Sequence, residues 1–310
     1  MASQANQALP EGAQLDKYRI VRTLASGGFS IVYLAQDEND SPVVIKEYLP
    51  STLALRAEPG QPPKIAPADL PRFRYGMKCF FEEGRALAKL QHPNVVRVLN
   101  FFRANETVYL VMRYERGRSL AQHIQNRKGM PDEIWLRSTF AQLLNGLREV
   151  HTNKLLHLDI KPANVFLRND GSPLLIDFGA ARQTLSGEEA QLPPTYTPGF
   201  AAPEQYARKA EVGPWTDIYS VGATAYACLA AAAPPHAHLR LEKDELVSAR
   251  RAWKNQYSAV LLDIIDWCLR LDHLERPQSV FALQKALLGE KEPERKSSKP
   301  FFGLLGAKSK

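Results

Sequence analysis

Two short runs place acidic, amide and basic side chains at a spacing suited to chemistry on a phosphate. The first run is His157-Leu158-Asp159-Ile160-Lys161-Pro162-Ala163-Asn164, and the second is Asp177-Phe178-Gly179. Phosphoryl transfer from a magnesium nucleotide needs one carboxylate to accept the substrate proton and a cation to offset charge on the phosphoryl group. It also needs an amide and a second carboxylate to hold the metal. The two runs supply all four groups and therefore predict this reaction.

The two runs resemble the catalytic loop H-R-D-x-x-x-x-N and the D-F-G motif of protein kinases. Other motifs of that family occur in the family's order. They are a glycine-rich loop at 24–33, a V-A-I-K-like strand at 43–46, a segment at 197–204 that closes in A-P-E, and the start of a long buried helix at 217–222. The resemblance covers roughly residues 15–289. It is closest to bacterial serine/threonine kinases, particularly those that read K-E-Y-L-P after the strand lysine, as residues 46–50 do here.

The resemblance implies a role for each residue of the two runs. Asp159 is the expected catalytic base, and Lys161 is expected to contact the transferred phosphoryl group. Thr197 is similar to the threonine that bonds both of them in kinases specific for serine and threonine. Asn164 and Asp177 are expected to hold Mg²⁺, with Mn²⁺ as an alternative metal.

Lys46 is the expected phosphate-binding lysine, and it needs a glutamate partner from the next helix. Glu82 and Glu83 both qualify. Counting back from the His92-Pro93 pair, with Leu87 one turn later on the core side, favours Glu83. Glu82 stays as the alternative.

The residues implied to surround ATP come from the glycine-rich loop, the lysine strand, the connection between lobes and the strand after the catalytic loop. They are Leu24, Ala25, Ser26, Gly27, Gly28, Phe29, Ser30, Val32, Val44, Lys46, Met112, Arg113, Glu115 and Phe166. Ala25 and Ser30 replace two of the three glycines in G-x-G-x-x-G, and Val44 replaces an alanine. The eroded loop supports an alternative function, a pseudokinase or nucleotide-binding scaffold. A small-molecule kinase is a weaker alternative, because the Thr197-to-Glu204 segment is a feature of kinases that act on proteins.

Two further residues carry expectations from the family. Leu158 replaces the arginine that in many kinases pairs with a phosphate on the activation loop. The enzyme is therefore expected not to depend on that phosphate, although Thr184, Ser186, Thr195 and Tyr196 remain possible acceptors. Arg276 stands where the family has an arginine that pairs with the glutamate of A-P-E, here Glu204.

The elements that must position these residues predict an α+β protein, and the resemblance implies the two-lobed kinase fold. Alternating apolar residues predict three strands over 18–48, and further strands over 95–102 and 107–112. A helical period predicts helices at 80–90, 132–151, 216–232, 243–253, 257–271 and 277–288. We expect a small sheet lobe at about 15–114 and a larger helical lobe at about 115–289, together the kinase domain. Residues 1–14 are expected to be flexible, and the tail at 290–310 disordered.

Composition narrows the class of protein. The chain has 310 residues, 45% of them hydrophobic and 24% charged, with three scattered cysteines in no metal-binding spacing. No signal peptide or membrane-spanning run is recognised, so a cytoplasmic location is expected. The net charge of +7 is spread along the chain. Because no nucleic-acid motif accompanies it, no nucleic-acid partner is expected.

Two segments fall outside the family pattern. Residues 49–74 hold six prolines and are interpreted either as a partner site or as a tolerated surface loop. The tail carries Phe301-Phe302 and Leu304-Leu305 between lysines. Docking on a protein is the first hypothesis for it, and weak contact with an anionic membrane is the second. The expected partners are ATP, a protein substrate with a serine or threonine acceptor, and a cognate protein phosphatase of the kind that such bacterial kinases often have.

Overall fold

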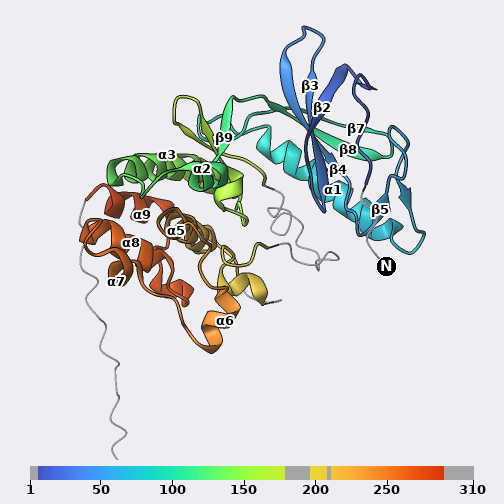
Figure 1. Ribbon diagram of the computed structural model, residues 1–310. Helices are drawn as coiled ribbons and strands as arrows, with labels where there is room; N and C mark the ends of the chain where they lie inside the picture. The colour runs from blue at the N-terminus through green and yellow to red at the C-terminus, as the bar shows by residue number, and fades with distance from the viewer. Residues whose placement is uncertain (1–5, 179–195, 208–210, 290–310) are drawn as a thin grey trace, which may run out of the picture.

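The computed structural model describes residues 6–178, 196–207 and 211–289. They form a small lobe built on a sheet and a larger lobe built from helices, with β9 and α2 near the junction (Figure 1). The predicted α+β architecture is therefore confirmed. Gly179, the acceptors Thr184, Ser186 and Thr195, and the tail at 290–310 lie outside the described residues.

The small lobe is built on a six-stranded antiparallel sheet in the order β1-β2-β3-β4-β8-β7. The strands are β1 (Gln14–Leu15), β2 (Tyr18–Ser26), β3 (Ser30–Gln36), β4 (Pro42–Tyr48), β7 (Val98–Ala104) and β8 (Thr107–Arg113). Burial in β3 alternates residue by residue, with Ile31, Tyr33 and Ala35 inside. This alternation is the period-2 pattern from which the strands were predicted.

Helix α1 (Leu70–Leu87) packs against β7 and β8. It begins ten residues before the predicted start at 80 and ends before the predicted end at 90. Pro71 lies in the first turn, where a missing N–H costs nothing, so this proline starts the helix and does not belong to the preceding loop. Phe73 and Phe80 face Tyr48 of β4 with ring centroids 5.3 and 5.7 Å away, so the added turns are part of the core.

The chain before the sheet and the proline-rich segment are packed on the small lobe. Of the predicted flexible residues 1–14, residues 6–14 differ from that expectation: Leu9 is buried, and its amide donates to the Tyr33 hydroxyl at 3.1 Å. The proline-rich segment contains a short hairpin of β5 (Ala54–Leu55) and β6 (Lys64–Ile65). Its Arg56 side chain is fully buried. The segment is therefore part of the folded lobe, held by contacts that lie far apart in sequence.

The large lobe surrounds helix α5, which is buried on nearly all sides and lies among α3, α8 and α9 (Figure 1). The helices are α2 (Leu120–Asn126), α3 (Glu133–Thr152), α5 (Pro214–Ala230), α6 (Ala237–Glu242), α7 (Ala249–Trp253), α8 (Ala259–Cys268) and α9 (Val280–Leu287). The helix predicted over 243–253 is wrong for residues 243–248. There the Asp244 side chain bonds the Leu246 amide and Arg240, and Ser248 caps a new helix, α7. Within the described ranges, no helix combines the length and apolar character needed to span a bilayer.

A three-stranded sheet in the order β11-β10-β9 joins the lobes. Its strands are β9 (Gly117–Ser119), β10 (Val165–Arg168) and β11 (Pro173–Leu175). They were not predicted, because strands of three or four residues are too short to show a period. The sheet is important for the site, since β10 directly follows the catalytic-loop run.

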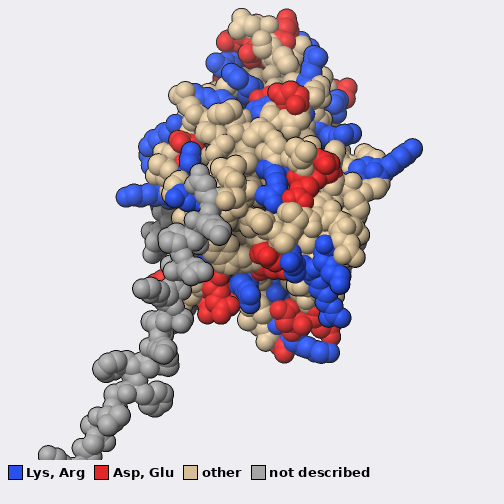
Figure 2. Space-filling model, turned by 90° about the vertical axis from the view of Figure 1, so that its left-hand side faces the viewer, with Lys and Arg blue, Asp and Glu red and all other residues tan. Residues whose placement is uncertain are grey.

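Charged side chains of both signs are interspersed over the face that Figure 2 shows. Such a mixture gives no extended field of one sign on this face. On the described part of this face, the basic side chains are thus interspersed with acidic ones and do not form a single positive patch.

Candidate active site

A pocket of about 490 Å³ lies between the lobes. Eight of the residues predicted to surround ATP line it: Leu24, Val32, Val44, Lys46, Met112, Arg113, Glu115 and Phe166. They come from β2, β3, β4, β10, the end of β8 and the connection that follows β8. The walls are mostly apolar, and charged side chains such as Lys46, Glu83 and Asp177 also line the pocket. This is the lining expected for a ligand with a flat apolar part and a charged part.

The floor of the pocket includes residues that sequence reasoning missed. Phe166 of β10 pairs with Leu174 of β11, and Ile176 follows directly. The signal was present in the sequence, because Asn169-Asp170-Gly171 is a turn sequence between two apolar runs. Other missed lining residues are Arg22, Leu87, Val96, Leu110, Tyr114, Gly117, Gln122 and Phe178.

The glycine-rich turn joins β2 to β3 beside the pocket. Ala25 and Ser26 end β2, Ser30 begins β3, and the turn itself is Gly27, Gly28 and Phe29, none of which lines the pocket. Neither Gly27 nor Gly28 has a positive φ. A Cβ on either would have no atom closer than 3.8 Å. The backbone conformation therefore does not require glycine here, and the loss of glycine at 25 and 30 leaves a normal hairpin.

Lys46 lies at the inner end of the pocket and is 5% exposed. Its Nζ forms an ion pair with Asp177 Oδ1 at 2.5 Å. Glu83, the predicted partner, is buried and lines the same pocket. Glu82 points elsewhere, since it pairs with Arg85 at 2.7 Å on the more exposed side of α1. The structure therefore brings together Lys46, Glu83 and Asp177, and leaves Glu82 outside.

Asp159, Lys161 and Thr197 form a closed triangle of contacts. Lys161 Nζ lies 2.7 Å from Asp159 Oδ2, and it also donates to Thr197 Oγ1 at 2.7 Å. The Thr197 hydroxyl in turn donates to Asp159 Oδ1 at 2.7 Å. Thr197 is 38 residues from Asp159 in sequence. The fold thus brings the A-P-E segment onto the catalytic loop and fixes both oxygens of the Asp159 carboxylate.

Asn164 joins the catalytic loop to the strand that leads to Asp177. Its side-chain amide donates to the Asp159 carbonyl and to Asp159 Oδ2, both at 2.9 Å. Its backbone carbonyl accepts from Ile176, the neighbour of Asp177, at 3.0 Å. Because the amide nitrogen is used in this way, the Asn164 oxygen is the atom free to act as a ligand. An amide oxygen and a carboxylate are hard donors that suit Mg²⁺, so these two residues fit that metal.

A buried carboxylate holds the backbone of the catalytic loop. Asp217, at the start of α5, is fully buried and accepts from the amides of His157 at 2.9 Å and Leu158 at 2.7 Å. His151 Nε2 lies 2.8 Å from the same carboxylate. Burial alone would raise the pKa of the Asp217 carboxyl, but the bond to His151 and its charge, with the contacts of His157, outweigh burial and hold that pKa below its usual range. Asp217 is therefore a charged anchor.

His157 packs against Phe178, with ring centroids 4.3 Å apart, and its Nε2 lies 3.2 Å from the Ile176 carbonyl. It is fully buried. These contacts match the structural packing role that the sequence suggested.

Leu158 replaces a charged residue with an apolar one in a buried position. It is 2% exposed and clusters with Leu156 and Val212. Its φ is +60°, an unusual value for a residue other than glycine, and the bonds of its amide to Asp217 and its carbonyl to Gln205 hold it there. The side chain offers no group that could bind a phosphate.

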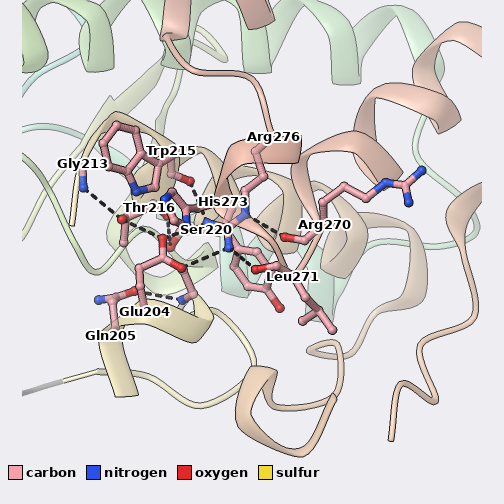
Figure 3. Close-up of polar contacts among 12 residues, drawn as sticks. Glu204, Gln205, Gly213, Trp215, Thr216, Ser220, Arg270, Leu271, His273 and Arg276 are labelled. Carbon is pink, nitrogen blue, oxygen red and sulfur yellow. Dashed lines mark hydrogen bonds and ion pairs between the residues drawn. The ribbon is translucent and has the colours of Figure 1, made fainter. Parts of the chain in front are cut away.

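The A-P-E glutamate, Glu204, is held by Arg276 in a buried ion pair, as the resemblance predicts. Two nitrogens of Arg276 lie 2.8 and 3.0 Å from the two oxygens of Glu204. Figure 3 shows Arg276 between Glu204 and the carbonyl groups of Arg270 and Leu271, which accept two of its remaining N–H groups; the Trp215 carbonyl accepts a third. Thr216 of α5 donates to Glu204 as well. Every charged atom of the pair is thus bonded, which is the condition for a stable buried ion pair.

Comparisons with known proteins agree with this geometry. The model of the family described as protein kinase domain matches residues 18–288. Among curated proteins, serine/threonine-protein kinase C of Synechocystis sp. is 30% identical over 307 residues, which cover 95% of this chain and 54% of that protein. Serine/threonine-protein kinase B of the same organism is 27% identical over 306 residues, with 94% and 50% covered. The chain spans about half the length of these curated relatives.

Solved structures give the same result. The apo form of PpkA-294 matches with a TM-score of 0.80 and 31% sequence identity, over 90% of this chain and 99% of that one. The PknI kinase domain of Mycobacterium tuberculosis matches with a TM-score of 0.68 and 23% identity, over 91% and 100%, which supports the fold alone. With a family model that covers nearly the whole described part, the chain belongs to the protein kinase family, and its relatives include bacterial serine/threonine kinases.

Proposed function

We propose that this chain transfers the γ-phosphoryl group of ATP to serine and threonine hydroxyls of protein substrates. The observation that carries the proposal is the triangle of Asp159, Lys161 and Thr197. It holds a carboxylate and an ammonium group together, next to a pocket whose size and lining suit a nucleotide. The names of the relatives support the same activity.

In the proposed reaction Asp159 is the base. Its carboxylate accepts the proton of the substrate hydroxyl while the hydroxyl oxygen bonds to the γ-phosphorus and the bond from that phosphorus to ADP breaks. Lys161 offsets charge on the transferred group. Thr197 keeps Asp159 and Lys161 in position through its two hydrogen bonds. Its contact with the base supports a serine or threonine acceptor.

Lys46 binds the phosphates of ATP in this proposal, with Glu83 as the residue that orients it. Asn164 and Asp177 would hold Mg²⁺, or Mn²⁺ in its place, through the amide oxygen and the carboxylate. When such a metal is bound, its charge neutralises the β- and γ-phosphate oxygens. Val44 and Phe166 would contact the adenine, and the backbone of Arg113 and Glu115 would bond its edge.

The proposed activity does not depend on a phosphate on the activation loop. Leu158 is apolar and buried beside Val212, so a phosphate on the loop would gain no charged partner at this position. Asp217 and Gln205 hold the backbone of the catalytic loop instead, through hydrogen bonds that do not require a phosphate. We propose that the enzyme is active as synthesised, in the cytoplasm, and that a protein phosphatase opposes it.

One assay separates the proposal from a pseudokinase and from a small-molecule kinase. The purified chain is incubated with radiolabelled ATP, Mg²⁺ and a generic basic protein, with Asp177→Ala as the control. Label on serine or threonine of the protein that is absent with Asp177→Ala supports the proposal. Nucleotide binding without any transfer supports the pseudokinase, and label released only on small molecules supports the third alternative.

A further inference from the structure

The start of the proline-rich segment is bonded to the glycine-rich turn. The Leu49 amide donates to the Phe29 carbonyl at 3.0 Å, and the Ser51 amide donates to the Gly28 carbonyl at 2.9 Å. The Ser51 hydroxyl donates to the same carbonyl at 3.2 Å. These bonds hold the tip of the turn from outside the β2–β3 hairpin.

The same segment is anchored in the core by one ion pair. Arg56 donates to the two oxygens of Glu47 at 2.9 and 2.5 Å, and both side chains are fully buried. Glu47 also accepts from the hydroxyls of Tyr33 at 2.7 Å and Tyr109 at 2.6 Å. Glu47 follows Lys46 directly in β4. The anchor is therefore attached to the strand that carries the phosphate-binding lysine.

The N-terminal residues close this arrangement. Asn6 accepts from the Arg56 amide at 2.6 Å and donates to the carbonyls of Leu49 and Ala54. The Gln7 amide donates to the Arg56 carbonyl at 2.9 Å. Residues 6–7 thus tie the two ends of segment 49–56 together and link the turn contact to the core anchor.

The position of these contacts indicates a role beyond stabilising the small lobe. A buried ion pair replaced by apolar groups of similar volume often leaves stability unchanged or improved, so stability alone is weak reason for one here. The glycine-rich turn, by contrast, is an exposed hairpin tip: Phe29 is 43% exposed, and only the contacts from residues 49 and 51 reach it from outside the hairpin among the described backbone bonds.

We propose that residues 49–56 act as a brace for phosphate binding. The brace holds the Gly27–Phe29 turn through Ser51 and is fixed to the Lys46 strand through Arg56 and Glu47. Ser51 and Arg56 are positioning residues, because they hold the Lys46 strand and the turn that is expected to close on the phosphates, and do not themselves line the pocket. The inference rests on the proposed use of ATP by this pocket.

Ser51→Pro tests the brace with little disturbance. The Pro50 carbonyl accepts from the Leu53 amide at 3.0 Å, so Ser51 is the second residue of a turn, where proline is well tolerated. The substitution removes both donors to Gly28. Ser51→Ala removes only the hydroxyl and keeps the amide. Arg56→Gln breaks the anchor, and Arg19→Gln, at an exposed ion pair in the same lobe, is the matched control.

The readout is affinity for two ligands, Mg-ATP and adenosine, measured by calorimetry on the full chain. Because only ATP has phosphates, loss of the brace should weaken ATP and leave adenosine unchanged within about twofold. One lost hydrogen bond corresponds to roughly a fivefold higher Kd for ATP. We expect that change for Ser51→Pro, a smaller one for Ser51→Ala, at least the same change for Arg56→Gln, and none for Arg19→Gln.

The outcomes are distinct. Wild-type affinity for ATP in Ser51→Pro, or equal weakening of ATP and adenosine, would overturn the brace. If Ser51→Pro and Arg56→Gln fail to fold, Ser51→Ala decides, and an ATP affinity equal to the wild type would count against the proposal. If the wild type itself binds no ATP, the proposed function fails first, and the two failures are thereby distinguished.

Discussion

Lys46 Nζ lies 2.5 Å from Asp177 Oδ1, across 131 residues of sequence and across the two lobes. The proposed reaction gives these two groups separate tasks, since the lysine binds phosphates and the aspartate holds the metal. Lys46 is nearly buried, whereas the Asp177 side chain is 44% exposed. In the proposed reaction Lys46 and Asp177 would therefore exchange part of this contact for the phosphates and the metal.

The first prediction concerns the partner of Lys46. Lys46→Met and Glu83→Ala should each lower kcat/KM for ATP by roughly tenfold or more, because hydrogen bonds to charged groups contribute about 1.5 to 3 kcal/mol. Glu82→Ala should stay within about threefold, since Glu82 pairs with Arg85 on the more exposed side of α1. Steady-state kinetics with varied ATP measures this. Loss of activity in Glu82→Ala together with normal activity in Glu83→Ala would show that Glu82, and not Glu83, is the partner of Lys46.

A second prediction concerns regulation. Because Leu158 is buried and apolar, treatment with a phosphatase should leave most of the activity in place. The combined variant Thr184→Ala, Ser186→Ala, Thr195→Ala should also be tolerated. Thr197→Ala should lose activity strongly, because it removes both hydrogen bonds to the catalytic pair. Activity that arises only after phosphorylation of the loop would contradict the account.

A third prediction follows from the lowered pKa of Asp217. A carboxyl whose pKa is lower in the folded than in the unfolded protein stabilises the fold above its unfolded value of about 3.9, and this contribution is lost as pH falls toward the folded value. Asp217→Asn should therefore lower the free energy of unfolding by about 3 kcal/mol near pH 7. Urea titrations should show this difference shrinking as pH is lowered below about 4. A difference that stays constant with pH would mean that the charge of Asp217 has no role.

A fourth prediction concerns the pair of Glu204 and Arg276. Arg276→Ala leaves Glu204 buried without its cation, which costs about 3 to 5 kcal/mol. Arg270→Ala is the matched control, because its side chain is 61% exposed and surface pairs contribute about 0 to 1 kcal/mol. Thermal unfolding should show a large drop in Tm for the first variant and little change for the second. Equal drops in Tm would show that both variants lose packing of the arginine side chain, and that the charge pair of Arg276 with Glu204 is not the cause.

Much of the fold and of the site was predictable because the relevant signals are local. The strands β2, β3 and β4 follow from period-2 alternation, and the site residues stand in short runs with fixed spacing. The beginning of α1 was not predicted, because Pro71 is equally compatible with a loop and with the first turn of a helix. Only the packing of Phe73 on Tyr48 distinguishes these two structures.

Other features depend on contacts that no local pattern contains. Arg56 looks like an exposed residue in a proline-rich loop, yet its burial is set by Glu47, Asn6 and the two tyrosines around them. Likewise, the pairing of Lys46 with Asp177 depends on how the lobes meet. Residues 6–14 have no apolar period, and their order comes from single contacts such as the Leu9 amide with Tyr33.

The central claim is that Asp159 transfers a proton during phosphoryl transfer and has no part in binding the nucleotide. The most direct measurement is the rate of phosphate transfer by Asp159→Asn at saturating Mg-ATP, with the Kd for ATP determined in parallel. The account predicts a rate at least a hundredfold lower, as for loss of a general base, and a Kd within about threefold of the wild type. Transfer at the wild-type rate, or a loss explained wholly by weaker ATP binding, would contradict it.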